Sequence, residues 1–213
     1  MKPMDRREQD RLRTRTAILD AAEALMCEEG YAAVTSRRVG ERAGLKSQLV
    51  HYHFGTMDEL FLEVFRRSDK QWFALTLNCL TSVDPLGELW KLGSASEGTD
   101  VVAELTAAAS HRTVLKKEMV ESITRHRMLT ETMISKYFDD YHIDNDKFSP
   151  KVISFILASI CDRLVTESKI GVSEGHAEII TFMDDFLRDL KSDGWAHAAH
   201  GRSPHAAKDQ RDV

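Results

Sequence analysis

Along most of this chain, apolar side chains recur every three or four residues, the spacing that gathers them on one face of an α-helix. The charged residues 1–13 lack this pattern, and we expect them to form a mobile arm. A stripe then runs from Ile18 through Ala22 to Met26, and Gly30 follows where glycine commonly ends a helix. The first predicted element is therefore an amphipathic helix over about residues 14–29.

Two short helices are predicted next, joined by a tight turn. Thr35 or Ser36 caps the first helix, and Gly44 breaks the pattern after it. Beyond the turn, Val50 and Phe54 lie four residues apart and face one way. A pair of helices joined by a glycine-containing turn is typical of the helix-turn-helix, whose second helix enters the major groove of DNA.

The second of these helices carries hydrogen-bonding side chains on its outer face. Gln48, His51 and Tyr52 lie opposite the apolar side when residues advance by about 100° each. Gln48 is the candidate for reading a base, because a side-chain amide pairs with adenine through two hydrogen bonds. Thr35 and Arg37 suit a phosphate contact, because backbone N–H groups at a helix N-terminus bind anions.

The remainder of the chain is also predicted to be helical. Thr56 and Glu59 form a capping box at the start of a long helix that extends to about Leu80, and Asp84-Pro85 begins the next one. No convincing strand pattern appears, so the predicted fold class is all-α. Further helices are expected at residues 86–95, 99–110, 114–141, 150–170 and 174–191.

Composition and charge narrow the function classes. Of 213 residues, 42% are hydrophobic and 30% charged, and no apolar run approaches the ~18 residues of a membrane span. The charged opening has no signal-peptide segment, so we expect a cytoplasmic protein that does not associate with membranes. Residues 1–56 hold ten Lys or Arg and eight Asp or Glu, a net charge of +2. Because the whole chain carries −5, the remaining residues carry −7. This asymmetry is expected where only one end meets phosphate.

No pattern supports catalysis or a resident cofactor. The three cysteines are widely spaced in helical patterns, where we expect small buried side chains rather than disulfides or metal ligands. His51 and His53 point about 200° apart on a helix and cannot share one ion. Phosphate-binding glycine loops, nucleophile elbows and HExxH motifs are not found in the sequence. We therefore expect no enzyme activity, no metal and no cofactor.

Four short motifs carry a resemblance to a known family. They are EEGYAAVT at residues 28–35, RAGL at 42–45, YHF at 52–54 and TMDEL at 56–60. Their order and spacing resemble the DNA-binding segment of the TetR (tetracycline-repressor) family of transcription regulators, over residues 18–61. The resemblance implies an N-terminal three-helix helix-turn-helix DNA-binding domain followed by a C-terminal helical ligand-binding and dimerisation domain. We expect the arm and DNA-binding domain in residues 1–56, the effector-binding and dimerisation domain in residues 57–193 and a flexible tail in residues 194–213.

The resemblance also assigns DNA contacts. In the family, Ser or Thr commonly stands in the place of Lys46, tyrosine in that of His51 and lysine in that of Met57, so affinity and operator sequence are expected to differ from those of its relatives. Gly40 stands where the family usually has alanine, and we interpret it as a site of close packing. The complete set of expected DNA-binding residues is Thr35, Arg37, Lys46, Ser47, Gln48, Leu49, His51, Tyr52 and His53.

Residues for dimerisation and for an effector are expected in the body. The last two helices carry apolar stripes, and the resemblance implies that they pair with their copies in a four-helix interface. The expected interface residues are Val152, Phe155, Ile156, Ile160, Phe182, Met183 and Phe186. Aromatic and methionine residues on the middle helices line an implied effector pocket or simply belong to the core, and both interpretations stay open. The expected lining residues are Trp72, Leu75, Trp90, Met119, Ile123 and Phe138.

Together these inferences predict a ligand-responsive regulator, acting as a repressor. It binds a palindromic operator in double-stranded DNA as a homodimer and is released by a small-molecule effector. Two alternatives stay open. One is an effector-independent architectural DNA binder, and the other is a helical small-molecule-binding protein whose DNA-binding head has decayed.

Overall fold

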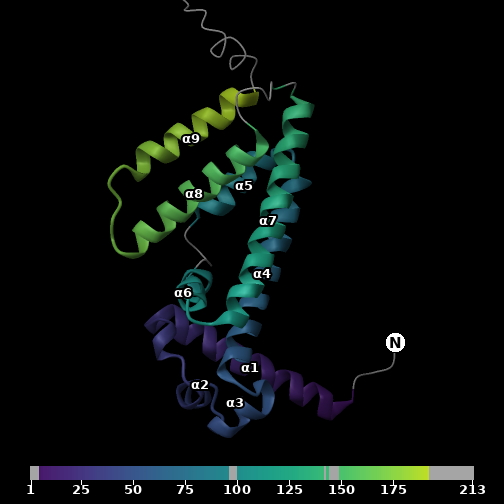
Figure 1. Ribbon diagram of the computed structural model, residues 1–213, viewed down its shortest axis with the longest axis vertical. Coiled ribbons are helices and arrows are strands. Elements are labelled where there is room, and N and C mark those ends of the chain that lie inside the picture. The colour runs from purple at the N-terminus through teal and green to yellow at the C-terminus, as the bar shows by residue number, and fades with distance from the viewer. Residues whose placement is uncertain (1–4, 96–99, 142, 144–148, 192–213) are drawn as a thin grey trace, which may run out of the picture. The chain divides into compact units, whose positions relative to one another are not determined.

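The computed structural model describes residues 5–95, 100–141, 143 and 149–191, and every regular element within them is a helix (Figure 1). The predicted all-α fold class is confirmed. The elements are α1 (Arg6–Glu29), the 3-10 helix η1 (Tyr31–Ala33), α2 (Ser36–Arg42), α3 (Ser47–Phe54), α4 (Met57–Leu80), α5 (Pro85–Ser94), α6 (Asp100–Ala109), α7 (Thr113–Asp140), α8 (Pro150–Lys169) and α9 (His176–Lys191). Among the described residues, no helix has the length and apolar character needed to cross a membrane.

The helix ends follow from local capping chemistry. Thr56 Oγ1 accepts a hydrogen bond from Glu59 N at 3.2 Å, while Glu59 Oε2 accepts one from Thr56 N at 3.2 Å, which confirms the capping box. Asp84 Oδ1 accepts from Gly87 N at 3.2 Å, and Pro85 occupies the first turn of α5. Because these caps are readable in the sequence, the five helices predicted after residue 80 agree with the structure to within two residues at each end.

The amino end departs from its prediction. α1 begins at Arg6. The prediction of a mobile arm through residue 13 is therefore wrong for residues 6–13, which are helical. Side chains in this first part of α1 are exposed, and Arg13 approaches Asp10 at 3.9 Å across one turn. The segment is rich in Arg, Gln, Glu and Leu, which favour helix without needing an apolar stripe. Residues 1–4 and the expected tail at residues 194–213 lie outside the described residues.

The chain forms two compact units, which we describe separately. The first unit comprises Met1–Leu75 and Glu97–His126, and the second comprises Thr76–Ser96 and Arg127–Val213. Helices α4 and α7 therefore each contribute residues to both units. The functional division expected after residue 56 concerns roles rather than packing, and it stays a prediction.

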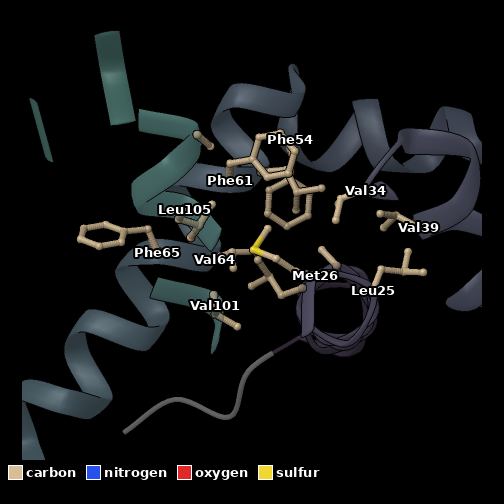
Figure 2. Close-up of a cluster of buried hydrophobic side chains, with 14 of the residues drawn as sticks. Leu25, Met26, Val34, Val39, Phe54, Phe61, Val64, Phe65, Val101 and Leu105 are labelled. Atoms are coloured by element: carbon tan, nitrogen blue, oxygen red, sulfur yellow. The ribbon is translucent and has the colours of Figure 1, made fainter. Parts of the chain in front are cut away.

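The core of the first unit joins α1, α2 and α3 to α4 and α6. Figure 2 shows Met26 of α1, Phe54 of α3 and Phe61 of α4 gathered in one cluster with Val101 and Leu105 of α6. Phe61 and Leu105 are almost completely buried, at 2% and 0% exposed. The α2–α3 pair is thus held on a continuous apolar base, which fixes the outer face of α3.

The core of the second unit lies between α5, the last half of α7, α8 and α9. Trp90, Ile134, Leu157 and Leu187 represent these helices in it. Cys79 is buried, as expected for the cysteines. Cys27 is exposed, so the expectation is wrong for this residue, because the apolar stripe of α1 places position 27 on the outer side of the helix.

Candidate nucleic-acid interface

The α2–α3 pair is joined by a tight turn at Gly44. Gly44 has φ +68°, in the left-handed region that glycine enters without strain, and Leu45 N donates to Gly40 O at 2.8 Å to close the turn. A Cβ on Gly40 would lie 3.0 Å from Leu45 O and 3.1 Å from Ser47 N. Glycine at position 40 therefore permits the close approach of α2 to the turn, in agreement with the packing role expected for it.

The outer face of α3 is open to solvent. Val50 and Phe54 are only 1% and 4% exposed, whereas Gln48 and His51 are exposed and Tyr52 is 77% exposed. This division is the one expected from the 100° rotation per residue. The helix consequently presents a row of polar and aromatic side chains over a buried apolar side.

Predicted contact residues on either side of the turn are also accessible. Thr35 caps α2 by accepting from Arg38 N at 3.3 Å, and Lys46 occupies the cap position of α3 without a side-chain capping bond. Thr35, Lys46 and Leu49 are exposed, the last at 37%, while Ser47 and His53 are half-buried. The structure thus brings the predicted DNA-binding set together on and around one helix, and their contacts with DNA stay a prediction.

Three arginines of α2 differ in their availability. Arg38 pairs with Glu29, and Arg42 forks onto Glu28 with one N–O distance of 2.6 Å, which ties α2 to the end of α1. The hydrogen bond from Arg38 lowers the pKa of Glu29. Arg37 is 81% exposed and only reaches Glu41 at 3.5 Å within its own helix. Arg37 is accordingly better placed than Arg38 or Arg42 to meet a phosphate.

Arg15 of α1 anchors the end of α3. Its Nη1 donates to His53 O at 3.0 Å, its Nη2 donates to Glu63 of α4 at 2.6 Å, and its guanidinium lies 4.2 Å from the centre of the Phe54 ring. Burial lowers the pKa of the His53 imidazole, and the positive charges of Arg11 and Arg15 lower it further. Arg15 therefore links three helices and favours a neutral His53.

His51 is held by its own helix end. Its Nδ1 lies 3.0 Å from Gly55 O, and a carbonyl oxygen only accepts, so Nδ1 carries the hydrogen. In the neutral ring the exposed Nε2 is then a bare acceptor. A phosphate oxygen also only accepts, and His51 can donate to one only as the protonated imidazolium.

Comparison with known proteins supports the interpretation of this segment. Residues 18–64 match the model of the family described as bacterial regulatory proteins, tetR family. The chain belongs to the TetR family. The matched segment holds the second half of α1, the helix-turn-helix of α2 and α3, and the first turns of α4.

Solved structures resemble this TetR-family chain over most of its length. A TetR-family transcriptional regulator from Rhodococcus sp. is 17% identical, with 84% of this chain and 100% of that one covered and a TM-score of 0.66. One from Mesorhizobium loti is 18% identical, with coverages of 84% and 96% and a TM-score of 0.62. The multidrug binding protein EbrR, complexed with imidazole, is 19% identical, with coverages of 83% and 93% and a TM-score of 0.56. These likenesses show a shared fold, and no curated protein matches this sequence.

The residues expected to line an effector pocket of this TetR-family regulator belong to both units. Met119 packs in the core of the first unit, and Trp90 and Phe138 pack in that of the second. Trp90 Nε1 donates to Asp184 at 2.9 Å, which satisfies the buried indole. Leu75 and Ile123 of the first unit are 46% and 50% exposed, and Trp72 is half-buried. Four of the six residues thus belong to the first unit and two to the second, and their role as lining stays a prediction.

The residues expected at a dimer interface divide into two groups. Val152, Phe155 and Ile156 of α8 and Phe182 of α9 are between 43% and 60% exposed. Ile160 and Phe186 are half-buried, and Met183 is 3% exposed within the core of the second unit. The role of these residues in a dimer interface stays a prediction.

Two polar clusters were not recognised in the sequence. Asp69 of α4, 14% exposed, accepts from Ser122, from Arg125 at 2.9 Å and from His126 Nε2 at 2.8 Å on α7. Arg125 and His126 are therefore engaged inside the first unit rather than offered to a ligand. No metal-binding group of three His, Cys, Asp or Glu side chains occurs in the part of the chain that the structure describes.

The second cluster surrounds Arg112, between α6 and α7. Its Nε donates to the Tyr31 hydroxyl, its Nη1 pairs with Asp58, and its guanidinium lies 5.0 Å from the centre of the Phe61 ring. Glu104 of α6 also accepts from Tyr31 N at 2.8 Å. No periodicity reveals such pairs, because their members are 51 to 81 residues apart.

Proposed function

We propose that this TetR-family regulator is a homodimeric repressor that binds a palindromic operator and releases it when a small-molecule effector binds. The observation that carries the proposal is the exposed outer face of α3, with Gln48, His51 and Tyr52 held above a buried apolar side. A helix of this kind fits the major groove, where an amide side chain distinguishes adenine from the other bases. The role is that of a regulator acting on DNA in the cytoplasm, not that of an enzyme.

Binding of specific DNA is tested with the duplex from upstream of the protein's own gene and a shuffled duplex of the same composition. Gln48→Ala is expected to cost about 1–3 kcal/mol on the first duplex, measured by fluorescence anisotropy at fixed salt, and to change binding to the shuffled duplex little. Gln71→Ala is the matched control, because Gln71 is exposed on α4. Equal weakening on both duplexes would contradict a base-reading role for Gln48.

Homodimerisation is supported by the exposed apolar side chains of α8 and α9. Large apolar side chains left open on a helix pair are costly in water, and a symmetric partner covers them with the same face of a second copy. Two recognition helices would then meet successive major grooves, about 34–36 Å apart on B-DNA. A palindromic operator follows from this two-fold arrangement.

The dimer proposal is tested by sedimentation of the full chain at micromolar concentration. Phe155→Glu places a charge in the proposed interface and is expected to convert dimers to monomers while leaving the helical circular dichroism intact. Val120→Glu is the control, because Val120 is 57% exposed and Phe155 is 58% exposed. A monomeric wild-type chain, or equal dissociation by both variants, is incompatible with the proposed interface.

Release by an effector is supported by the helical body that the chain shares with its structural relatives. One of these, EbrR, is described as a multidrug binding protein and was solved with imidazole. An effector acts by binding the DNA-free state more tightly than the DNA-bound state, and a typical coupling of about 1–3 kcal/mol changes DNA affinity some 5- to 150-fold. An architectural DNA binder, in contrast, would keep its affinity in the presence of every small molecule.

A further inference from the structure

The first turns of α1 precede the segment that matches the TetR family. The match begins at residue 18, whereas α1 begins at Arg6. Every side chain from residue 5 to residue 13 is exposed, and among the described residues none before Ile18 belongs to the buried core of the first unit. In Figure 1, α1, α2 and α3 lie together at one end of this unit, and the start of α1 projects away from the other two. Packing therefore does not explain the side chains that these turns carry.

Two arginines of these turns lie on the side of α1 that faces the core. Arg7 and Arg11 are four residues apart and differ by only about 40° around the helix axis. Ile18, seven residues after Arg11, lies about 20° from it and is completely buried. Arg6 and Arg13 lie about 140° and 160° from Arg11, on the opposite side. The core-facing side of α1 thus continues, beyond the core, as a pair of arginines.

Arg11 lies close to the end of α3. Arg15, one turn further along α1, donates to His53 O of α3. Burial lowers the pKa of the His53 imidazole, and the positive charge of Arg11 lowers it further. A charge has this effect only across a short distance, because solvent screens longer separations. Arg7 then continues the same line by one turn, about 6 Å along the helix axis.

The protein itself does not pair these two arginines. In the described part of the chain, no carboxylate forms an ion pair with Arg7 or Arg11, whereas Arg15 pairs with Glu63 at 2.6 Å. An arginine without a carboxylate partner suits phosphate oxygens, which the guanidinium fork binds through two hydrogen bonds. Because water accommodates exposed charges anywhere on a protein, it is the position of this pair beside α3 that points to a partner.

We propose that Arg7 and Arg11 bind the phosphate backbone of the DNA whose bases meet α3, and so extend the interface from the helix-turn-helix onto α1. The proposal rests on the proposed binding of operator DNA. Phosphates are the target rather than bases, because a helix about 10–12 Å across does not enter a minor groove about 6 Å wide. Contacts to phosphate position a protein on DNA without reading sequence. The pair therefore adds affinity and helps to orient α3 in the major groove.

The test compares two double variants of the full chain that remove the same charge from opposite sides of α1. The first carries Arg7→Gln and Arg11→Gln, and the matched control carries Arg6→Gln and Arg13→Gln. Binding is measured by fluorescence anisotropy over a series of salt concentrations, on the duplex from upstream of the protein's own gene and on its shuffled counterpart. Because both variants lose two positive charges, the general attraction between protein and DNA falls equally in both.

The two variants should separate clearly. The first should bind both duplexes at least about tenfold more weakly than the wild type, by a similar factor on each, because phosphates carry no sequence. Its slope of log K against log salt should become shallower by about 1.8 for each chain bound, or about 0.9 for each phosphate contact. The control should differ from the wild type by less than about threefold. Both variants should melt within about 2 °C of the wild type, because the four side chains are exposed.

Three results would overturn the proposal. The first is equal weakening by both double variants, which would mean that only net charge matters. The second is wild-type affinity in the variant that lacks Arg7 and Arg11. The third is a preference of the wild type for A·T-rich over G·C-rich flanking sequence that this variant loses, because the arginines would then read the minor groove. Equal wild-type affinity for the upstream and shuffled duplexes would instead contradict operator recognition, and the two variants would still decide the phosphate contacts.

Discussion

Replacement of Arg15 tests whether the position of the recognition helix depends on contacts behind it. The side chain is about one third exposed, at 32%, and it reaches α3 and α4 from α1. In Arg15→Met the aliphatic stem is retained, while the bonds to His53 O and Glu63 and the contact with the Phe54 ring are lost. The last turn of α3 then keeps its apolar packing but loses its external anchor.

The magnitude follows from the three contacts. A hydrogen bond from a charged donor contributes about 1.5–3 kcal/mol, a partly exposed cation–π contact about 0.5–1 kcal/mol and a partly exposed ion pair about 0.2–1 kcal/mol. One side chain makes all three, so their values are not additive. We expect Arg15→Met to lower the free energy of unfolding by about 2–3 kcal/mol, and Arg15→Lys by about 1–2 kcal/mol.

Thermal unfolding and DNA binding together test whether Arg15 anchors α3 or binds phosphate. A loss of 1 kcal/mol corresponds to about 2–4 °C in melting temperature for a chain of this size. Arg13→Met is the control, because Arg13 is 80% exposed two residues away and should change stability by less than about 0.5 kcal/mol. Two results together would refute the anchoring role: the melting temperature of Arg15→Met is unchanged, and the salt dependence of its DNA binding falls by about one phosphate contact. They would indicate that Arg15 binds phosphate instead.

Two further predictions concern polar groups of the first unit. Burial alone would raise the pKa of Asp69, but the hydrogen bonds that its carboxylate accepts from α7 outweigh burial and lower the pKa. The ionised carboxylate therefore stabilises the fold above about pH 4, and this stabilisation is lost as the pH falls through the lowered pKa. Asp69→Asn should therefore have a lower free energy of unfolding than the wild type at pH 7, by about 1–3 kcal/mol, and this difference should shrink near pH 2. A difference that stays constant with pH would refute the prediction. Arg112→Met should cost about 1–3 kcal/mol, and in a cycle with Tyr31→Phe the two losses should be less than additive, whereas full additivity would mean that the pair does not interact.

Local chemistry explains why much of the fold was predictable. The caps at Thr35, Thr56, Asp84 and Ser149 each act within three residues, so the sequence alone reveals where the helices begin. The outer face of α3 was also predictable, because a fixed rotation per residue separates Gln48 from the buried side. Periodicity failed at residues 6–13, where an exposed helix has no stripe to detect.

The contacts behind the candidate interface could not be predicted in the same way. Arg15 carried the same charge as Arg11 and Arg13 in the sequence, and only the fold shows that it points to the end of α3. The pairing of Asp69 with α7 joins residues 53 to 57 positions apart.

Helix α6 packs into the same core as the helix-turn-helix of this regulator. Val101 and Leu105 share a buried cluster with Met26 and Phe61 (Figure 2). Glu104 accepts a hydrogen bond from the backbone N–H of Tyr31, between α1 and α2. A close-packed core transmits displacement because it cannot absorb it in voids. Movement of α6 by even a fraction of an ångström would therefore disturb the same core that supports α3. It follows that the orientation of α3 depends on residues 101–112 as well as on the helix-turn-helix, and that an effector able to shift α6 would not need to touch α2 or α3 to alter DNA affinity.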